Sequence, residues 1–67
     1  MLAQYQVIIL LKDINPGLKT GMAGVIFEVW DKETFEVEFL DQDGFNYTYS
    51  GQITFTLKQS DIKPLEV

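Results

Sequence analysis

The chain has 67 residues, enough for a single domain over residues 1–67, and 46% of them are hydrophobic, so a folded core is expected. It has no cysteine and no histidine, which excludes disulfides, thiolate nucleophiles and the commonest zinc ligand. The net charge is −5 and all five basic residues are lysines, so binding to nucleic acid is disfavoured.

The apolar runs are short. The longest, at residues 7–11, is far too short to span a bilayer, and the first residues lack the regions of a signal peptide. The absence of cysteine fits a reducing compartment. We therefore expect a cytoplasmic protein with no membrane contact.

Strand signals dominate the N-terminal half. Residues 5–11 are apolar at odd and even positions, which indicates a strand covered on both faces. A folded-over loop at 12–21 follows. In it, Pro16-Gly17 suits the centre of a type II turn, because proline fixes φ and glycine accepts positive φ. A strand at 25–31 and another at 35–40 then predict a hairpin.

Alternation assigns the two faces of this hairpin. The residues predicted to point into the core are Val25, Phe27, Val29, Phe35, Val37 and Phe39. Those predicted to point outward are Ile26, Glu28, Trp30, Glu36, Glu38 and Leu40. The register depends on the connection: a three-residue loop places Glu28 opposite Glu38, and a five-residue loop places it opposite Glu36. The sequence does not decide between these two registers.

The segment 45–58 alternates strictly, with apolar residues or glycine at odd positions and polar residues at even ones. A two-residue turn at Ser50-Gly51 would pair Tyr49 with Gln52 and mix the two kinds on one face. A continuous strand bent at Gly51 keeps apolar and polar residues on separate faces, as does a three-residue loop at 50–52. We predict the bent strand, and we expect Phe45, Tyr47 and Tyr49 to pack in the core.

The C-terminal residues predict a short turn and a short strand. Ser60-Asp61-Ile62 is typical of one 3₁₀ turn capped by Ser60, and Pro64 confines the strand at 63–66 to a sheet edge. The predicted fold is all-β: a small five-stranded barrel with one 3₁₀ turn before the last strand.

Several segments together resemble a known family. They are Val7-Ile8-Ile9-Leu10, residues 18–25, Phe35-Glu36-Val37-Glu38-Phe39, Asp43-Gly44 and residues 60–65. The chain resembles a family of small bacterial proteins defined only as a domain of unknown function, whose members resemble SH3-like barrels of the translation-protein type. The resemblance covers nearly the whole chain. It implies an SH3-like barrel and a bacterial origin, and it implies no activity.

Two features are candidate interaction surfaces. Seven of the ten acidic residues lie within residues 28–43, which indicates either an acidic face for a basic partner or a solvated face that resists aggregation. The outward apolar residues are Ile8, Leu10, Ile26, Trp30 and Leu40. They would form a partner or dimer surface, or else be half-buried because a tightly curled barrel covers both faces of its strands.

No pattern in the sequence predicts a catalytic or metal-binding site. Asp41-Gln42-Asp43-Gly44 lacks the glycine and glutamate that a calcium loop needs, so it predicts a turn. We expect no catalytic residue, metal, cofactor or small-molecule substrate. We expect a non-catalytic interaction module or accessory subunit that binds a protein partner or a second copy. The predicted contact residues are Ile26, Trp30, Leu40, Glu28, Glu36 and Glu38. The alternative is a nucleic-acid or ribosome-associated SH3-like module, which the charge opposes.

Overall fold

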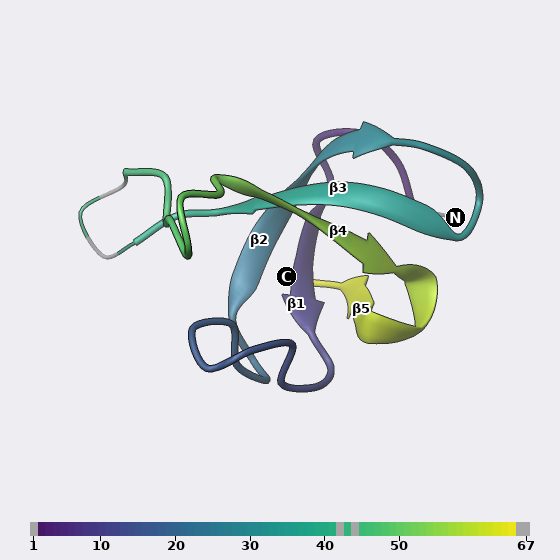
Figure 1. The fold of residues 1–67 in the computed structure, drawn as a ribbon. Helices are drawn as coiled ribbons and strands as arrows, with labels where there is room; N and C mark the ends of the chain where they lie inside the picture. The colour runs from purple at the N-terminus through teal and green to yellow at the C-terminus, as the bar shows by residue number, and fades with distance from the viewer. Residues whose placement is uncertain (1, 42, 44, 66–67) are drawn as a thin grey trace.

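The computed structural model describes residues 2–41, 43 and 45–65. The elements are β1 (Val7–Leu10), β2 (Ala23–Val29), β3 (Thr34–Phe39), β4 (Thr54–Lys58), the 3₁₀ turn η1 (Gln59–Asp61) and β5 (Ile62–Pro64). The strands form one antiparallel sheet in the order β4-β3-β2-β1-β5 (Figure 1). The predicted all-β fold, with five strands and a 3₁₀ turn before the last one, is confirmed.

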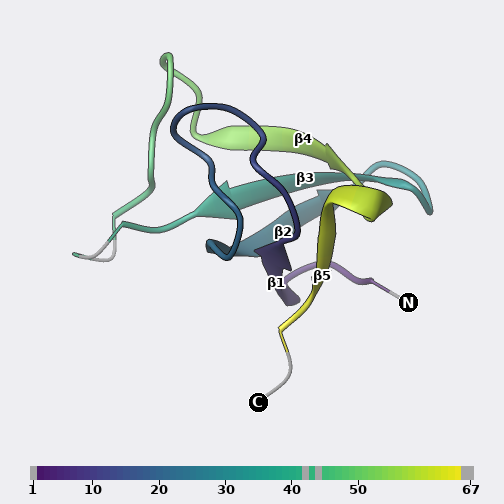
Figure 2. The same ribbon diagram turned by 90° about the horizontal axis from the view of Figure 1, so that it is seen from below.

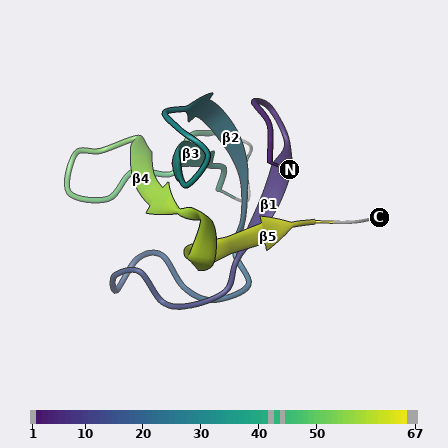
Figure 3. The same ribbon diagram turned by 90° about the vertical axis from the view of Figure 1, so that its right-hand side faces the viewer.

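The sheet is strongly curled around a single core. Seen from the side in Figure 3, β5 passes beneath the other strands, and η1 joins it to β4. Pro64 lies in β5 at the edge of the sheet, as predicted, because proline has no N–H to donate to a further strand. The buried apolar residues are Ile8, Leu10, Leu18, Ile26, Phe35, Val37, Phe39, Phe55, Leu57 and Ile62.

The register between β2 and β3 explains where the alternation succeeds and fails. Phe35, Val37 and Phe39 are buried, as predicted for β3. In β2 the pairing passes from Ile26↔Val37 to Glu28↔Glu36, so Phe27 is the extra residue of a β-bulge. The bulge reverses the alternation, and it leaves Ile26 inside and Phe27 48% exposed. The predicted directions of these two side chains are wrong for this reason, as is that of Val25, which pairs with the outward Glu38.

The connection between β3 and β4 is an arm with its own turn, which lies away from the body of the sheet in Figure 1. The N–H of Tyr49 donates to the carbonyl of Gln52 at 3.1 Å, and the reverse bond is 3.0 Å. Between them, Ser50 has φ 53° and Gly51 has φ 80°, which are the signs of a type I′ turn. The predicted bent strand is therefore wrong. The turn mixes polar and apolar residues at little cost, because most of the arm is exposed.

The loop between β1 and β2 reaches the arm, as Figure 2 shows from below. A Cβ added to Gly17 would lie 2.5 Å from the Tyr47 hydroxyl and 2.5 Å from the Tyr49 ring. Both tyrosines are half-buried and pack against the core, as predicted, whereas Phe45 is exposed, so its predicted place in the core is wrong. The predicted turn at Pro16-Gly17 forms, but it is not type II, because Gly17 is not among the residues with positive φ. Glycine is needed there for space.

Candidate interaction surface

The outer face of the sheet brings together the acidic residues predicted to bind a partner. Glu28, Glu36 and Glu38 all lie on this face, opposite to the core. Glu28 is paired directly with Glu36, which is the register of the five-residue connection. Like charges directly opposed in a sheet are destabilising by a few tenths of a kcal/mol or more, so this pair needs compensation from its surroundings.

Glu36 receives that compensation from three donors. The hydroxyl of Thr56 donates to its Oε1 at 2.6 Å, and the hydroxyl of Thr54 donates to its Oε2 at 2.7 Å. The indole Nε1 of Trp30 donates to Oε1 at 3.2 Å. Partial burial alone would raise the pKa of Glu36, but the hydrogen bonds from Thr56, Thr54 and Trp30 outweigh it and lower that pKa below its usual value. Glu36 is therefore a charged, positioned carboxylate at neutral pH.

Trp30 is the principal exposed aromatic of this face. Its side chain is 62% exposed, although its only polar atom is already bonded to Glu36. Its backbone N–H donates to the carbonyl of Thr34 at 3.0 Å, which fixes the residue at the end of the β2–β3 hairpin. An exposed indole whose N–H is satisfied within the protein has only its ring surface left to offer a partner.

A shallow hollow of about 570 Å³ lies beside Trp30. Its lining residues are Leu2, Val29, Trp30, Asp31, Lys32, Glu33 and Gln59. The pKa of Asp31 is lowered chiefly because its carboxylate accepts the backbone N–H of Glu33 at 2.8 Å. The hollow is thus lined by apolar side chains, Leu2 and Val29, and by the carboxylates of Asp31 and Glu33.

The other two predicted contact residues do not join this surface. Ile26 is fully buried opposite Val37, so the prediction that it lies on the outer face is wrong; the cause is the β-bulge. Ile8 and Leu10 are also buried, not outward. Leu40 is 50% exposed, but it pairs with Asn46 beyond the far end of β3. Six residues of strand separate it from the Trp30 end, about 20 Å at ~3.3 Å per residue.

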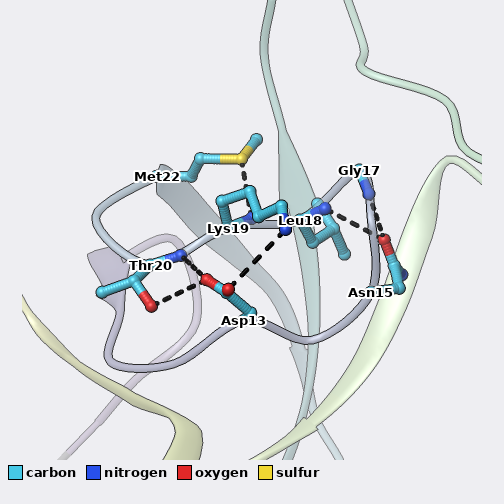
Figure 4. Close-up of polar contacts among 7 residues, drawn as sticks. All are labelled: Asp13, Asn15, Gly17, Leu18, Lys19, Thr20 and Met22. Atoms are coloured by element: carbon cyan, nitrogen blue, oxygen red, sulfur yellow. Dashed lines mark hydrogen bonds and ion pairs between the residues drawn. The ribbon is translucent and has the colours of Figure 1, made fainter.

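The loop between β1 and β2 uses its polar groups internally (Figure 4). One carboxylate oxygen of Asp13 accepts both the N–H and the hydroxyl of Thr20 at 2.9 Å, and these bonds lower the pKa of Asp13. The side-chain oxygen of Asn15 accepts the N–H groups of Gly17 and Leu18 at 2.8 and 2.9 Å. The loop is thus an ordered support for the buried Leu18 side chain.

Asp61 is a structural residue that sequence reasoning missed. It is buried, with 8% exposure, and its carboxylate accepts the N–H of Lys58 at 2.9 Å and contacts the Lys12 ammonium at 2.8 Å. Burial alone would raise its pKa, but the bonds from Lys12 and Lys58 prevail and lower it. The predicted cap by Ser60 is wrong, because η1 begins at Gln59 and encloses Ser60. The available signal was the place of this acidic residue in the predicted 3₁₀ turn Ser60-Asp61-Ile62.

The acidic residues that the structure describes do not gather into a metal-binding cluster. Within residues 2–41, 43 and 45–65, no group of three or more metal-ligating acidic side chains gathers at one point. Asp41 accepts the N–H groups of Asp43 and Phe45 at 2.9 and 3.0 Å, so it organises a turn, as predicted; Gln42 and Gly44 lie outside the described residues. In the same part of the chain, no helix has the length and hydrophobicity needed to cross a bilayer.

Comparison with known proteins gives one family. Neither the curated proteins nor the solved structures include a match to the chain. A family model described as "Domain of unknown function (DUF4926)" matches residues 4–64, from the residues before β1 to the end of β5. The matched region contains all five strands, η1 and the outer face described above. The chain therefore belongs to the DUF4926 family of domains of unknown function.

Proposed function

We propose that this domain is a non-catalytic protein-interaction module or small accessory subunit, and that it binds its partner through the outer face near Trp30. The observation that carries the proposal is an exposed tryptophan held in place by Glu36. Tryptophan is a frequent anchor of protein interfaces, and a side chain that is already positioned loses little entropy on binding. The strand order and the 3₁₀ turn before β5 further support the expected SH3-like barrel.

A non-catalytic role fits the chemistry of the face. The chain has neither histidine nor cysteine, and Glu36 is engaged by three donors on an open sheet surface. Catalytic carboxylates instead need an enclosed site that excludes water. The three glutamates of the face also oppose a polyanion, which favours a protein partner over a nucleic acid. The lack of cysteine supports the proposed cytoplasmic location.

Photo-crosslinking from single introduced cysteines tests the proposal, since the natural chain has none. A benzophenone attached at Lys32→Cys lies beside Trp30, and one at Gln52→Cys lies in the turn of the arm; both positions are exposed. We expect position 32 to crosslink one protein in host lysate, with or without nuclease, and to lose it with Trp30→Ala. Position 52 should not crosslink that protein.

Two results would contradict the proposal. One is equal crosslinking of the same proteins from both positions, which would mean that the outer face near Trp30 has no special role. The other is a crosslink that disappears after nuclease treatment, which would indicate a nucleic acid. Circular dichroism of Trp30→Ala establishes that the variant remains folded.

A further inference from the structure

We propose that the surface around Trp30 binds a basic segment of the partner protein, with an arginine side chain stacked on the exposed indole face. This inference rests on the proposed function and specifies the chemistry of the partner. Its basis is the combination of a tryptophan ring whose N–H is already used, an adjacent apolar hollow and the carboxylates around both.

The indole has no polar group left to offer. Tryptophan is a donor only, and its single N–H is directed at Glu36 Oε1. What remains exposed is the π face, which carries negative charge density and attracts apolar groups or cations. A hydrogen bond from the N–H to a carboxylate pushes electron density into the ring, so the contact with Glu36 strengthens the attraction for a cation.

The charges around the ring select a cation over an apolar group. Glu28 lies opposite Glu36 on the sheet, while Asp31 and Glu33 line the hollow beside Trp30. The opposing charge is Lys32, which lines the same hollow. Lys58, across from Thr34, is the next cation along this end of the face. Four carboxylates against two ammonium groups leave a net negative site, which complements a basic partner.

The lining of the hollow offers contacts to both the apolar and the charged part of an arginine side chain. Leu2 and Val29 supply apolar contacts for its methylene stem, and Asp31 and Glu33 supply carboxylates for its guanidinium. Arginine is favoured over lysine because its planar guanidinium stacks on aromatic rings and pairs with carboxylates in a fork geometry. Its weaker hydration also lowers the cost of burial at an interface.

The same charges argue against two other occupants. A second copy docked through this face would bring Glu28 and Glu38 against the same glutamates of its partner, and like charges across an interface cost several kcal/mol. A nucleic acid would meet the same repulsion from its phosphates. A basic protein segment is the occupant that the face complements.

The experiment is an NMR titration of the ¹⁵N-labelled domain with two short probes. One probe is a glycine-flanked arginine pentapeptide, and the other is the same peptide with citrulline, which keeps the shape and removes the charge. We expect the amides of residues 28–36 to shift with the arginine probe, which binds about 2- to 5-fold more tightly than the citrulline probe, as a surface cation–π contact of ~0.5–1 kcal/mol implies.

Four variants separate stacking on the Trp30 ring from general electrostatic attraction. Trp30→Phe should weaken binding of the arginine probe partially, and Trp30→Ala should reduce its preference over citrulline to the part that the carboxylates alone provide. Glu28→Gln should weaken binding about 2-fold, while Asp43→Asn, an equal change of charge in the connection between β3 and β4, should change it less. Equal binding of both probes, or equal effects of the Glu28 and Asp43 variants, would overturn the proposal. Similar shifts with an oligothymidylate would overturn it too.

The failure of this inference can be distinguished from the failure of the proposed function. A protein that crosslinks at position 32 in a Trp30-dependent way, with no preference for arginine over citrulline, would refute this inference and keep the interaction module. A Trp30-dependent preference for arginine with no crosslinked protein would support the cation site and refute the interaction module.

Discussion

Replacing Asp61 should destabilise this domain more than any other exchange of a charged side chain described above. Asp61→Ala removes two interactions together: the acceptor for the N–H of Lys58 and the partner of the Lys12 ammonium. These contacts join the end of β4 and the residues after β1 to η1. A domain of this size has little stability to lose, since it buries only ~60% of the surface that its unfolded chain exposes.

The expected magnitude follows from the two contacts. Loss of a capping acceptor costs ~0.5–2 kcal/mol, and the orphaned N–H adds to it where water cannot reach. The Lys12 side chain is 59% exposed, so its pairing contributes no more than ~1 kcal/mol. We expect about 2 kcal/mol for Asp61→Ala. Asp61→Asn keeps an acceptor oxygen and should cost ~1 kcal/mol, and Lys12→Met should cost ~0.5 kcal/mol.

Thermal unfolding followed by circular dichroism measures these differences. For domains of 60–100 residues, each kcal/mol shifts Tm by ~4–8 °C, so Asp61→Ala should lower Tm by roughly 8–16 °C. The double variant of Asp61→Asn with Lys12→Met should lose less than the sum of the single variants, because both remove the same pair.

The contribution of Asp61 to stability should decrease as the pH falls. The pKa of Asp61 is lower in the folded protein than the ~3.9 of an unfolded aspartate. Its carboxylate therefore stabilises the fold above that unfolded pKa, and this contribution is lost as pH falls through the folded pKa. The difference in unfolding free energy between wild type and Asp61→Asn should be full at pH 6 and shrink below pH 4. A difference that stays constant to pH 2, or equal Tm values for the alanine and asparagine variants, would refute the reasoning.

Three further predictions concern the sheet and its turn. Trp30 is the sole tryptophan, and its fluorescence should change when acid protonates Glu36. In the wild type, the midpoint of this change should lie below the usual glutamate pKa, because the pKa of Glu36 is lowered in the folded protein. In Glu36→Gln the change should vanish. Gly24→Ala should destabilise by ~1–3 kcal/mol in urea titrations, because the added Cβ would lie 2.7 Å from the buried Phe39 ring. Gly51→Ala should lower Tm by a few degrees, since φ is +80° and strain there costs ~1 kcal/mol; an unchanged Tm would argue against the type I′ turn.

The fold class followed from the sequence because alternation is reliable where one face is buried and the other is solvated. β3 satisfies this condition, and its inward phenylalanines were predicted correctly. The bulge at Phe27 was not predictable, since nothing in the local sequence shows where an extra residue enters a strand. The turn at Ser50-Gly51 was missed because a parity argument assumes a buried face, and most of the arm is exposed.

The acidic residues of the candidate surface and the exposure of Trp30 were predictable, but the contact between Trp30 and Glu36 was not. Clustering in the sequence and outward parity placed Glu28, Glu36 and Glu38 on one face, as the structure has them. The contact between Trp30 and Glu36 depends on the hairpin register, which the sequence left open between two alternatives. Ile26 was assigned to the surface by a parity that the bulge reverses.

The pairing of β5 with β1 has a consequence for the biogenesis of the protein. Ile62 is buried and lies opposite Leu10, so one row of the core joins residues about fifty positions apart in the chain. During synthesis, β1 to β4 can pair in turn as they emerge, but β1 keeps an open edge until residues 62–64 are available. A pairing of such high sequence separation makes folding slow compared with helical domains. The incomplete sheet is thus the form that the cell must protect from aggregation.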